Sequence, residues 1–357
     1  MQKIKANTYN IEIGDLIDSS FKELLSEKYT NAKKIIIVDE NSNEYCLEHL
    51  LTSFDCLKEA EVMLLPAGEE NKVLEVCFQV WEALSEYEAT RNDLIINLGG
   101  GVVTDMGGFI ASIYKRGIDF INIPTTLLAM VDASVGGKTG IDLGPYKNQL
   151  GTFTNPQAVF VDPRFCQTLE PTEIMSGFAE MLKHGLALDK VYWKELIKIN
   201  SNDKVLNAEF IYRSIALKNE IVEADPKEKG QRKLLNFGHT IGHAIEGYSL
   251  SRTPISHGHA VGIGMLAESY ISYRQGNLEQ SEWKEIESFL INLYPMIDLE
   301  KENFGNVVAL MKNDKKNNNG LILSCLLENI GEGIYNQVVS EKQIIDTLNY
   351  LTNTFES

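Results

Sequence analysis

The sequence predicts a two-domain α/β protein, with an N-terminal α/β domain over residues 1–165 and a mainly α-helical domain over residues 166–357. Three observations carry this prediction. Short β-branched runs alternate with helical patterns in the first half, and long helical periods dominate the second half. A chain of 357 residues is also long enough to divide into two domains of ordinary size.

Five apolar runs predict the strands of the first domain, and they occupy residues 33–40, 61–70, 93–101, 119–126 and 158–163. Between the second and third runs, residues 71–89 place apolar side chains at helical spacing. This pattern is typical of a crossover helix that connects two parallel strands. The first domain is therefore expected to contain a parallel sheet.

The second half contains long periodic segments, at residues 171–188, 206–224 and 259–274, with few strand signals. The short tract at 313–320 reads as a polar turn, and the sequence contains no internal repeat. These features predict the helical domain.

The charge composition limits which molecules the protein is expected to bind. The 33 basic residues stand against 50 acidic ones, and a net charge of −17 repels a nucleic-acid backbone. An anionic ligand must therefore be bound by a local cluster of cations. The five cysteines form no CxxC pair, as expected of reduced thiols in the cytoplasm, and no apolar run reaches the roughly 18 residues of a membrane span.

A glycine turn follows the third predicted strand, at Gly99, Gly100 and Gly101. Backbone amides approach phosphate closely at such a turn. It lacks the GxGxxG fingerprint, and a tight strand-to-helix connection explains the three glycines equally well. Asp105 and the end of the next strand at 124–126 add polar groups where parallel sheets bind ligands, which favours binding.

A glycine-rich segment at residues 131–153 carries Asp132, Lys138, Lys147 and Asn148 with little apolar content, and it is predicted to be a long loop. Its two lysines are candidates for the anion site, the alternative being solvated surface lysines. Arg116 is a further cation that sequence alone would assign to a solvated helix end.

Four of the six histidines lie within 21 residues, and His239 and His243 share one helix face at i and i+4. This spacing can bind a metal. Glu180 and Lys183 place an acid and a base on one face of another helix. A lone histidine is more often a buried imidazole, but the cluster, with Lys218, Arg232 and Asn236 nearby, favours a site.

Six motifs together resemble the 3-dehydroquinate synthases in order and spacing, over about Ile35 to Gly331. They are LGGGVVTDMGGF, IPTTLLAMVDASVGGKTGIDL, KNQLGTF, GFAEMLKHG, LLNFGHTIGHAIE and SHGHAVGIGM. The resemblance implies a Rossmann-like NAD-binding domain, a helical domain that binds metal and substrate, an active site in the cleft between them, and a homodimer.

The resemblance assigns a catalytic zinc or cobalt ion to Glu180, His239 and His257, whereas helical spacing alone favours His239 with His243. Positions that contact NAD correspond to Asp39, Glu69, Lys72, Gly100, Gly101, Val102, Asp105, Thr125, Thr126, Lys138, Lys147 and Thr168. Positions that contact the substrate correspond to Asp132, Lys138, Asn148, Lys183, Lys218, Arg232, Asn236 and His243, with Lys315 and with Arg116 reaching across the dimer interface.

The implied substrate is 3-deoxy-D-arabino-heptulosonate 7-phosphate, a sugar-acid phosphate of the shikimate pathway to aromatic amino acids. The implied reaction oxidises C5 with NAD, eliminates phosphate, returns the hydride, opens the ring and closes a carbocycle by an aldol step. Two departures from the family pattern, Thr104 and Tyr146, bear on the NAD loops. The alternatives are an NAD-dependent alcohol dehydrogenase of the same fold, another sugar-phosphate cyclase, and a non-catalytic binding protein.

Overall fold

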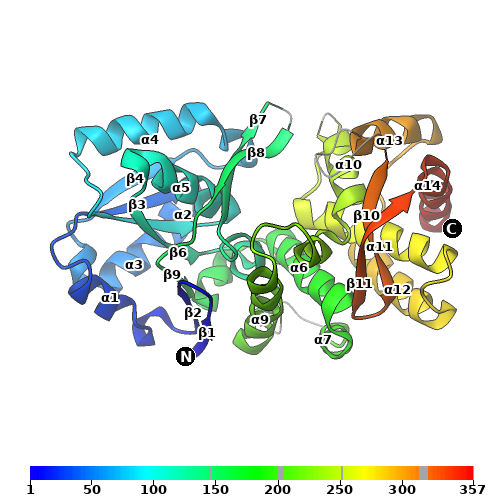
Figure 1. The fold of residues 1–357 in the computed structure, drawn as a ribbon, viewed down its shortest axis with the longest axis horizontal. Coiled ribbons are helices and arrows are strands. Elements are labelled where there is room, and N and C mark those ends of the chain that lie inside the picture. The colour runs from blue at the N-terminus through cyan, green and yellow to red at the C-terminus, as the bar shows by residue number, and fades with distance from the viewer. Residues whose placement is uncertain (145, 200–204, 251, 313–320, 357) are drawn as a thin grey trace. The chain divides into compact units, whose positions relative to one another are not determined.

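The computed structural model describes residues 1–144, 146–199, 205–250, 252–312 and 321–356. The chain divides into two compact units (Figure 1). Unit 1 comprises Met1–Glu170 with Leu206–Asn219, and unit 2 comprises Pro171–Val205 with Glu220–Ser357. The sequence predicts one boundary, between residues 165 and 166. In the structure the chain leaves unit 1 five residues later, and a second segment returns to it.

Unit 1 is built on a seven-stranded sheet with the order β1-β2-β9-β6-β5-β3-β4. β1 and β2 pair antiparallel, and the other pairs are parallel. The strands are β1 (Gln2–Lys5), β2 (Asn10–Ile13), β3 (Lys34–Asp39), β4 (Glu61–Leu65), β5 (Leu94–Gly99), β6 (Asp119–Pro124) and β9 (Ala158–Val161). The five predicted strands are β3, β4, β5, β6 and β9.

The central strands read as continuous apolar runs because helices cover both faces of the sheet. Ile35 and Ile37 of β3 belong to the core under α4 (Leu74–Glu86) and α5 (Gly101–Ile113). On the opposite face, Phe21 of α1 (Phe21–Glu27) makes edge contacts with Phe54 and with Phe160 of β9. The helices α2 (Glu40–Tyr45) and α3 (Leu47–Ser53) complete this unit (Figure 1). α4 is the predicted crossover helix.

The predicted glycine-rich loop is instead a β-hairpin of β7 (Lys138–Leu143) and β8 (Tyr146–Phe153). Glycines hide this hairpin from the sequence pattern because they replace the alternating apolar side chains. A Cβ at Gly140 would lie 2.8 Å from the carbonyl oxygen of Leu150, and one at Gly151 would lie 2.4 Å from that of Thr139. The two strands therefore approach closely because they have no side chains at these positions.

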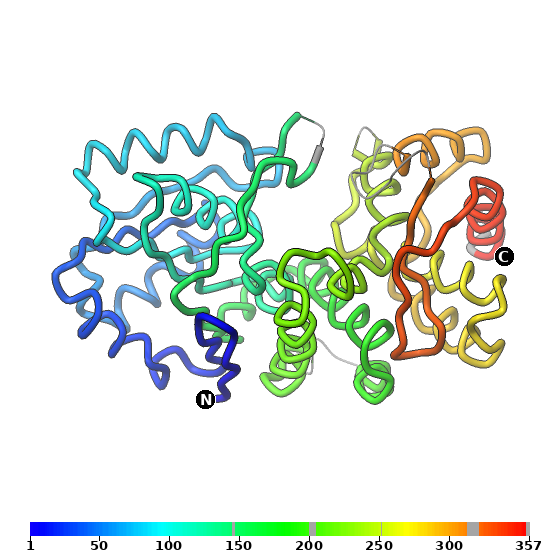
Figure 2. Tube along the Cα trace, in the orientation of Figure 1, coloured from blue at the N-terminus to red at the C-terminus, as the bar shows by residue number. Residues whose placement is uncertain are grey.

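Unit 2 is mainly helical, as predicted, but it also contains the hairpin of β10 (Ile322–Asn329) and β11 (Glu332–Val339). The C-terminal helix, red in Figure 2, packs by stacking Tyr350 on Tyr270 with ring centroids 4.1 Å apart. The helices are α6 (Pro171–Leu188), α7 (Lys190–Leu196), α10 (His239–Ser249), α11 (His257–Arg274), α12 (Gln280–Leu293), α13 (Phe304–Lys312) and α14 (Glu341–Glu356), while α9 (Ala208–Ala224) has residues in both units. The fold class predicted from sequence, α/β with two domains, is confirmed. The polar turn predicted at 313–320 lies outside the described residues.

Within the part of the chain that the structure describes, none of the helices combines the length and apolar character required to cross a bilayer.

Candidate metal centre and nucleotide site

Three helices of unit 2 bring the three predicted metal ligands together. Glu180 lies in the middle of α6, His239 is the first residue of α10, and His257 is the first residue of α11. Glu180 Oε1 lies 3.5 Å from His239 Nε2 and 3.5 Å from His257 Nε2. One carboxylate oxygen and two imidazole nitrogens therefore face one another.

These donor atoms fit a single divalent cation. Two ligand atoms each about 2.1 Å from a tetrahedral zinc lie about 3.4 Å apart, close to the spacing found here. Glu180 is fully buried, and the Lys183 ammonium and the two imidazoles face its carboxylate oxygens. A buried carboxylate is costly unless cations compensate its charge.

The Lys183 ammonium supplies one compensating charge, since it pairs with Glu180 Oε2 within α6. Burial raises the pKa of Glu180, but Lys183 and the two imidazoles outweigh it and hold that pKa well below its usual range. Glu180 is therefore ionised at neutral pH. Lys183 is buried as well, and its ion pair with Glu180 places this predicted substrate residue beside the predicted metal ligands.

The Nδ1 nitrogen of each of these two imidazoles also has a hydrogen-bonding partner. His239 Nδ1 lies 3.1 Å from the carbonyl oxygen of Phe237, and His257 Nδ1 lies 3.4 Å from Glu246 Oε2. A ligating histidine commonly donates its other ring N–H to such an acceptor, which leaves Nε2 for the metal. Sequence reasoning missed Glu246, although its position three residues after His243 and seven after His239 places it on the same helix face.

His243 belongs to the same cluster. Its ring centroid lies 5.0 Å from that of His239 and 5.6 Å from that of His257. The donor nitrogens of the three histidines lie within 4.8 Å of one another. The geometry thus places His243 within reach of either a metal or a molecule bound beside it.

Close helix packing fixes these positions. A Cβ at Gly258, the residue after His257, would lie 2.2 Å from Cα of Ser176, which is one helical turn before Glu180. Ser176 Oγ also accepts a hydrogen bond of 3.0 Å from the Gly258 amide. A Cβ at Gly242 would lie 2.8 Å from the Ala260 carbonyl oxygen. α6, α10 and α11 therefore meet backbone to backbone around the site.

The short 3-10 helix Gln231–Asn236 carries two more predicted residues. Arg232 is buried, and its Nη1 donates a 2.7 Å hydrogen bond to the Pro226 carbonyl. The Asn236 amide donates to Glu228 Oε1. Asp225 accepts hydrogen bonds from the backbone amides of this loop, and these bonds, with that of Gly230 foremost, lower its pKa. The loop that presents Arg232 is thus internally bonded.

In unit 1 several of the predicted NAD residues lie at the carboxyl ends of the parallel strands β3, β5 and β6. Asp39 ends β3 and caps α2, accepting a 2.7 Å hydrogen bond from the Ser42 amide. Gly100 is the N-cap of α5, whose first turn contains Gly101 and Val102. A Cβ at Gly100 would lie 3.0 Å from the Thr126 side chain. The amide of Thr125, just after β6, donates to the Gly99 carbonyl at 2.9 Å.

Thr104, a departure from the family pattern, turns back along its own helix. Its Oγ1 donates to the carbonyl oxygens of Gly100 and Gly101, both at 3.2 Å. The side chain is buried within unit 1. The extra hydroxyl is thus accommodated by the first turn of α5. For Tyr146, the other departure, the side chain lies outside what the structure describes.

A buried lysine organises a second part of unit 1. Lys72 Nζ lies 2.7 Å from Asp105 Oδ2 and 2.8 Å from Asn148 Oδ1. Burial lowers the pKa of Lys72, but the carboxylates of Asp105 and Glu69 outweigh it and raise that pKa. Asp142, which sequence reasoning missed, accepts a 2.6 Å hydrogen bond from the Asn148 amide. Three residues predicted separately are thus one hydrogen-bonded group.

Asp132 and Lys218 form another pair within unit 1. Lys218 Nζ donates to Asp132 Oδ1 at 2.6 Å and to the Asp132 carbonyl. Asp132 lies in a single π-helical turn, Ala129–Ala133, and such turns are frequent at functional sites. Lys218 lies in the part of α9 that belongs to unit 1.

Other predicted positions are exposed. Lys147 Nζ lies 3.8 Å from Glu69 Oε1, and both side chains are partly exposed. Lys138, Thr168 and Arg116 lie at the surface of unit 1, with Arg116 in a left-handed backbone conformation after α5. Lys315 lies outside the described residues.

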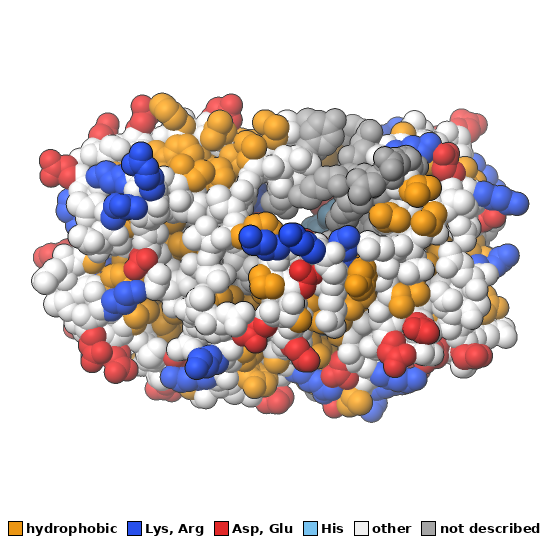
Figure 3. All heavy atoms as spheres, in the orientation of Figure 1, with side chains coloured by type: hydrophobic (Ala, Val, Ile, Leu, Met, Phe, Trp, Pro, Cys, Tyr) orange, Lys and Arg blue, Asp and Glu red, His pale blue; other side chains and the backbone are white. Residues whose placement is uncertain are grey.

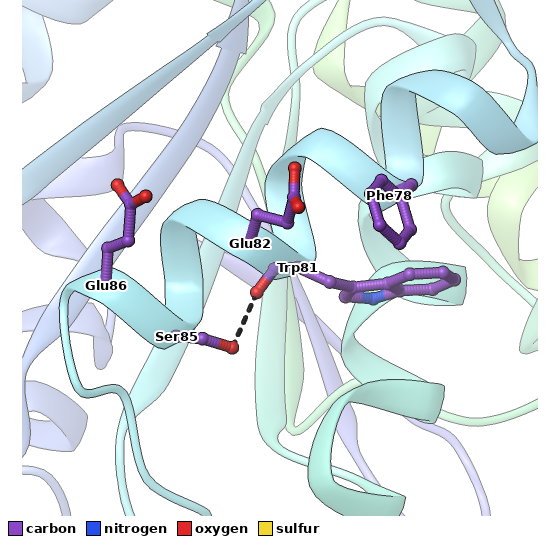
Figure 4. A pocket seen from close by; sticks show the side chains of 5 residues that line it. All are labelled: Phe78, Trp81, Glu82, Ser85 and Glu86. Carbon is purple, nitrogen blue, oxygen red and sulfur yellow. Dashed lines mark hydrogen bonds between the residues drawn. The ribbon is translucent and has the colours of Figure 1, made fainter.

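Unit 1 also has a surface pocket on α4. It is lined by Phe78, Trp81, Glu82, Ser85 and Glu86 (Figure 4). Phe78 is 56% exposed, and apolar side chains gather on the surface over this helix (Figure 3). The pocket holds none of the predicted site residues.

Comparison with known proteins decides the family. The family model for the 3-dehydroquinate synthase N-terminal region matches residues 62–176, and the model for the C-terminal region matches residues 177–317. The chain belongs to the 3-dehydroquinate synthase family. A 3-dehydroquinate synthase from Parabacteroides distasonis is 41% identical over 344 residues, which cover 95% of this chain and 96% of that protein. One from Clostridium botulinum is 39% identical, covering 92% of this chain and 95% of that protein.

Several solved structures show the same fold. The 2-epi-5-epi-valiolone synthase ValA from Streptomyces hygroscopicus, with NAD+ and Zn2+ bound, matches with a TM-score of 0.82 and 26% identity over 99% of both chains. A 2-deoxy-scyllo-inosose synthase complexed with carbaglucose-6-phosphate, NAD+ and Co2+ also has a TM-score of 0.82, at 23% identity, and covers 98% of this chain and 99% of its own. A butanol dehydrogenase from Thermotoga maritima has a TM-score of 0.70 at 16% identity.

Proposed function

We propose that this protein is a 3-dehydroquinate synthase, a carbon–oxygen lyase that converts 3-deoxy-D-arabino-heptulosonate 7-phosphate into 3-dehydroquinate and phosphate. The observation that carries the proposal is the convergence of Glu180, His239 and His257, with 3.5 Å between the facing donor atoms, in a chain that matches the family over both halves. The curated relatives named above carry the same activity in their names.

In this proposal Glu180, His239 and His257 hold a zinc or cobalt ion. When bound, the ion would supply Lewis-acid polarisation of the C5 alcohol, while NAD would accept hydride from C5 and later return it. An oxygen and two nitrogen ligands leave coordination positions open to the substrate, as a catalytic site requires. The hydrogen bonds of Phe237 and Glu246 hold the two imidazoles in the orientation that this role needs.

The strand ends of unit 1 are the proposed NAD site. The N-terminus of α5 presents the amides of Gly101 and Val102, and a helix N-terminus favours the negative charge of a pyrophosphate. The carboxylate of Asp39 at the end of β3 suits ribose hydroxyls. The remaining proposed NAD contacts are Glu69, Lys72, Gly100, Asp105, Thr125, Thr126, Lys138, Lys147 and Thr168.

Substrate binding is assigned to cations, because a chain of net charge −17 must collect a trianionic ligand locally. Arg232 is the proposed phosphate anchor, since a guanidinium offers phosphate two parallel hydrogen bonds. The bound phosphate would take the C6 proton as it leaves, so these residues orient it as well as bind it. The other proposed substrate residues are Asp132, Lys138, Asn148, Lys183, Lys218, Asn236 and His243, with Lys315 and Arg116.

A homodimer in the cytoplasm is part of the same proposal. Arg116 is exposed at the end of α5, which suits a residue that acts in a partner's site, and all five cysteines are free. Mixing inactive Arg116→Ala and His257→Ala variants tests this. Random reassociation would make about half of the dimers mixed, and each mixed dimer would contain one intact site. About one site in four would therefore be active. Sedimentation as a monomer, or no restored activity after exchange of subunits, would contradict the dimer.

The activity is tested with purified protein, the heptulosonate phosphate, NAD and Zn2+. We expect phosphate release in equal amount to a carbocyclic product, with no accumulation of NADH. Steady production of NADH would instead indicate a dehydrogenase. A sugar phosphate without a carboxylate serves as the control substrate, and its faster turnover would indicate one of the other cyclases.

A further inference from the structure

A buried carboxylate outside the proposed ligand set caps the helix that begins with His239. Glu268 lies in α11 and is fully buried. Its Oε2 accepts a 2.7 Å hydrogen bond from the Gly238 amide, and its Oε1 accepts bonds from the amides of Thr240 at 3.1 Å and Ile241 at 3.3 Å. Three amides at the start of α10 thus share one carboxylate from another helix.

The N-terminus of α10 has no capping side chain of its own. Its N-cap is Gly238, which has no side chain and a left-handed backbone with φ of 79°. A Cβ there would lie 2.6 Å from the Met265 side chain, so the close packing excludes a serine or an aspartate at this position. The first amides of a helix have no intrahelical acceptor, and a carboxylate satisfies them with charge-assisted bonds.

The position of this cap relates it to the metal ligands. His239 lies between Gly238 and Thr240, both bound by Glu268. His257 begins the helix that carries Glu268 three turns later. The two helices touch through backbone here, since a Cβ at Gly264 would lie 1.8 Å from the Gly238 carbonyl oxygen. One carboxylate therefore ties the start of α10 to α11.

We propose that Glu268 is a positioning residue that sets the separation of His239 and His257, and with it the affinity of the site for a divalent cation. This inference rests on the metal site of the proposed function. Glu268 contacts the backbone on both sides of His239 and acts through that residue. A purely structural cap would alter stability and leave the affinity of the folded protein for metal unchanged.

The test is binding of Co2+ alone to the full-length protein after chelation, measured by competition with a chromogenic chelator and by the visible absorption of the bound ion. For E268Q, which replaces one acceptor oxygen by a donor facing the amides, we expect Co2+ affinity to fall by about tenfold or more. We also expect a changed Co2+ spectrum and faster hydrogen exchange at residues 238, 240 and 241.

Ser272→Ala is the matched control. Ser272 is buried one turn further along α11, and its Oγ accepts a 3.0 Å hydrogen bond from the Leu327 amide of β10. We expect this variant to be less stable, with unchanged Co2+ affinity and spectrum. Equal Co2+ affinity and spectra in E268Q and wild type would overturn the positioning role, as would an equal loss of affinity in S272A.

If E268Q does not fold, E268D is used in the same Co2+ binding test, because it keeps the charge but shortens the reach of the carboxylate to the amides. Wild-type Co2+ affinity in E268D would then overturn the inference, and reduced affinity with an altered spectrum would support it. Failure of the wild-type protein to bind Co2+ would instead overturn the metal site of the proposed function, and the inference with it.

Discussion

Glu180 Oε1 lies 3.5 Å from Nε2 of His257, a contact between the middle of one helix and the first residue of another. We predict that His257→Ala abolishes metal retention and turnover, because it removes one of two nitrogen donors, while the packed helices keep the fold. Metal content after gel filtration and far-UV circular dichroism measure the two effects. His259→Ala, two residues later in α11, is the control and should retain metal. Full activity of H257A in metal-free buffer would contradict the ligand assignment.

Glu246 is predicted to tune the site without ligating the metal. Its carboxylate lies 3.4 Å from His257 Nδ1, and removal of such a partner commonly lowers metal affinity about 10- to 100-fold. Glu246→Gln should therefore bind Co2+ more weakly than wild type but more tightly than H257A. Glu287→Gln, at another buried acid of unit 2, should leave Co2+ affinity unchanged. Unaltered Co2+ affinity in E246Q would contradict a role of Glu246 in metal binding.

Lys72 is predicted to be essential to the stability of unit 1. Lys72→Met leaves Asp105, whose side chain is only 19% exposed, without its cation, which costs up to about 3 to 5 kcal/mol of unfolding free energy. Urea denaturation measures this loss. Lys28→Met, which breaks the exposed pair with Asp119, should cost within about 1 kcal/mol. A K72M/D105N double variant should recover much of the lost stability, and equal losses in the single and double variants would contradict the pairing.

The stability loss in K72M should also depend on pH. Burial already raises the pKa of Asp105, and without Lys72 it rises further above the unfolded value of about 3.9. Below the unfolded pKa the carboxyl is neutral in both states and costs nothing, whereas stability falls as pH rises through the folded pKa. The difference from wild type should therefore be larger at pH 8 than at pH 5.

Arg232→Lys is predicted to reduce turnover more than NAD binding. The change keeps the charge but loses the two parallel hydrogen bonds of a guanidinium. Losing a charge-assisted contact costs roughly 1.5 to 3 kcal/mol, or about tenfold to more than a hundredfold in rate. NAD affinity, measured by fluorescence titration, should stay within about threefold. Arg252→Lys, at an exposed arginine of unit 2, is the control. Lost NAD binding with normal turnover at saturating NAD would place Arg232 on the nucleotide side.

The sequence predicted the central strands well because burial on both faces leaves an unbroken apolar run, as in the fully buried β5. It missed the hairpin of β7 and β8, where Gly140 and Gly151 replace apolar alternation with close backbone contact. It also missed the hairpin of β10 and β11, and in β11 only Val339 is buried, so that strand gives no apolar pattern. In both cases pairing across the hairpin defines the strands, and no apolar alternation marks them in the sequence.

In the candidate site, too, local sequence patterns indicate some residues and give no signal for others. Helical spacing finds His239 and His243 because they share one helix, but it cannot find Glu180 or His257, which come from two other helices. The assignment of those ligands came from the family resemblance. Glu268 has no local signal at all, because its partners are backbone amides of a different helix.

In the proposed function the protein moves a hydride from C5 to NAD and returns it to the same carbon. The most direct measurement uses the heptulosonate phosphate labelled with deuterium at C5, with mass analysis of the carbocyclic product and of the nucleotide. We predict that the product keeps the deuterium at the carbon where it began and that the NAD pool stays unlabelled. Deuterium accumulating in reduced nucleotide, with an unlabelled ketone as product, would contradict the account.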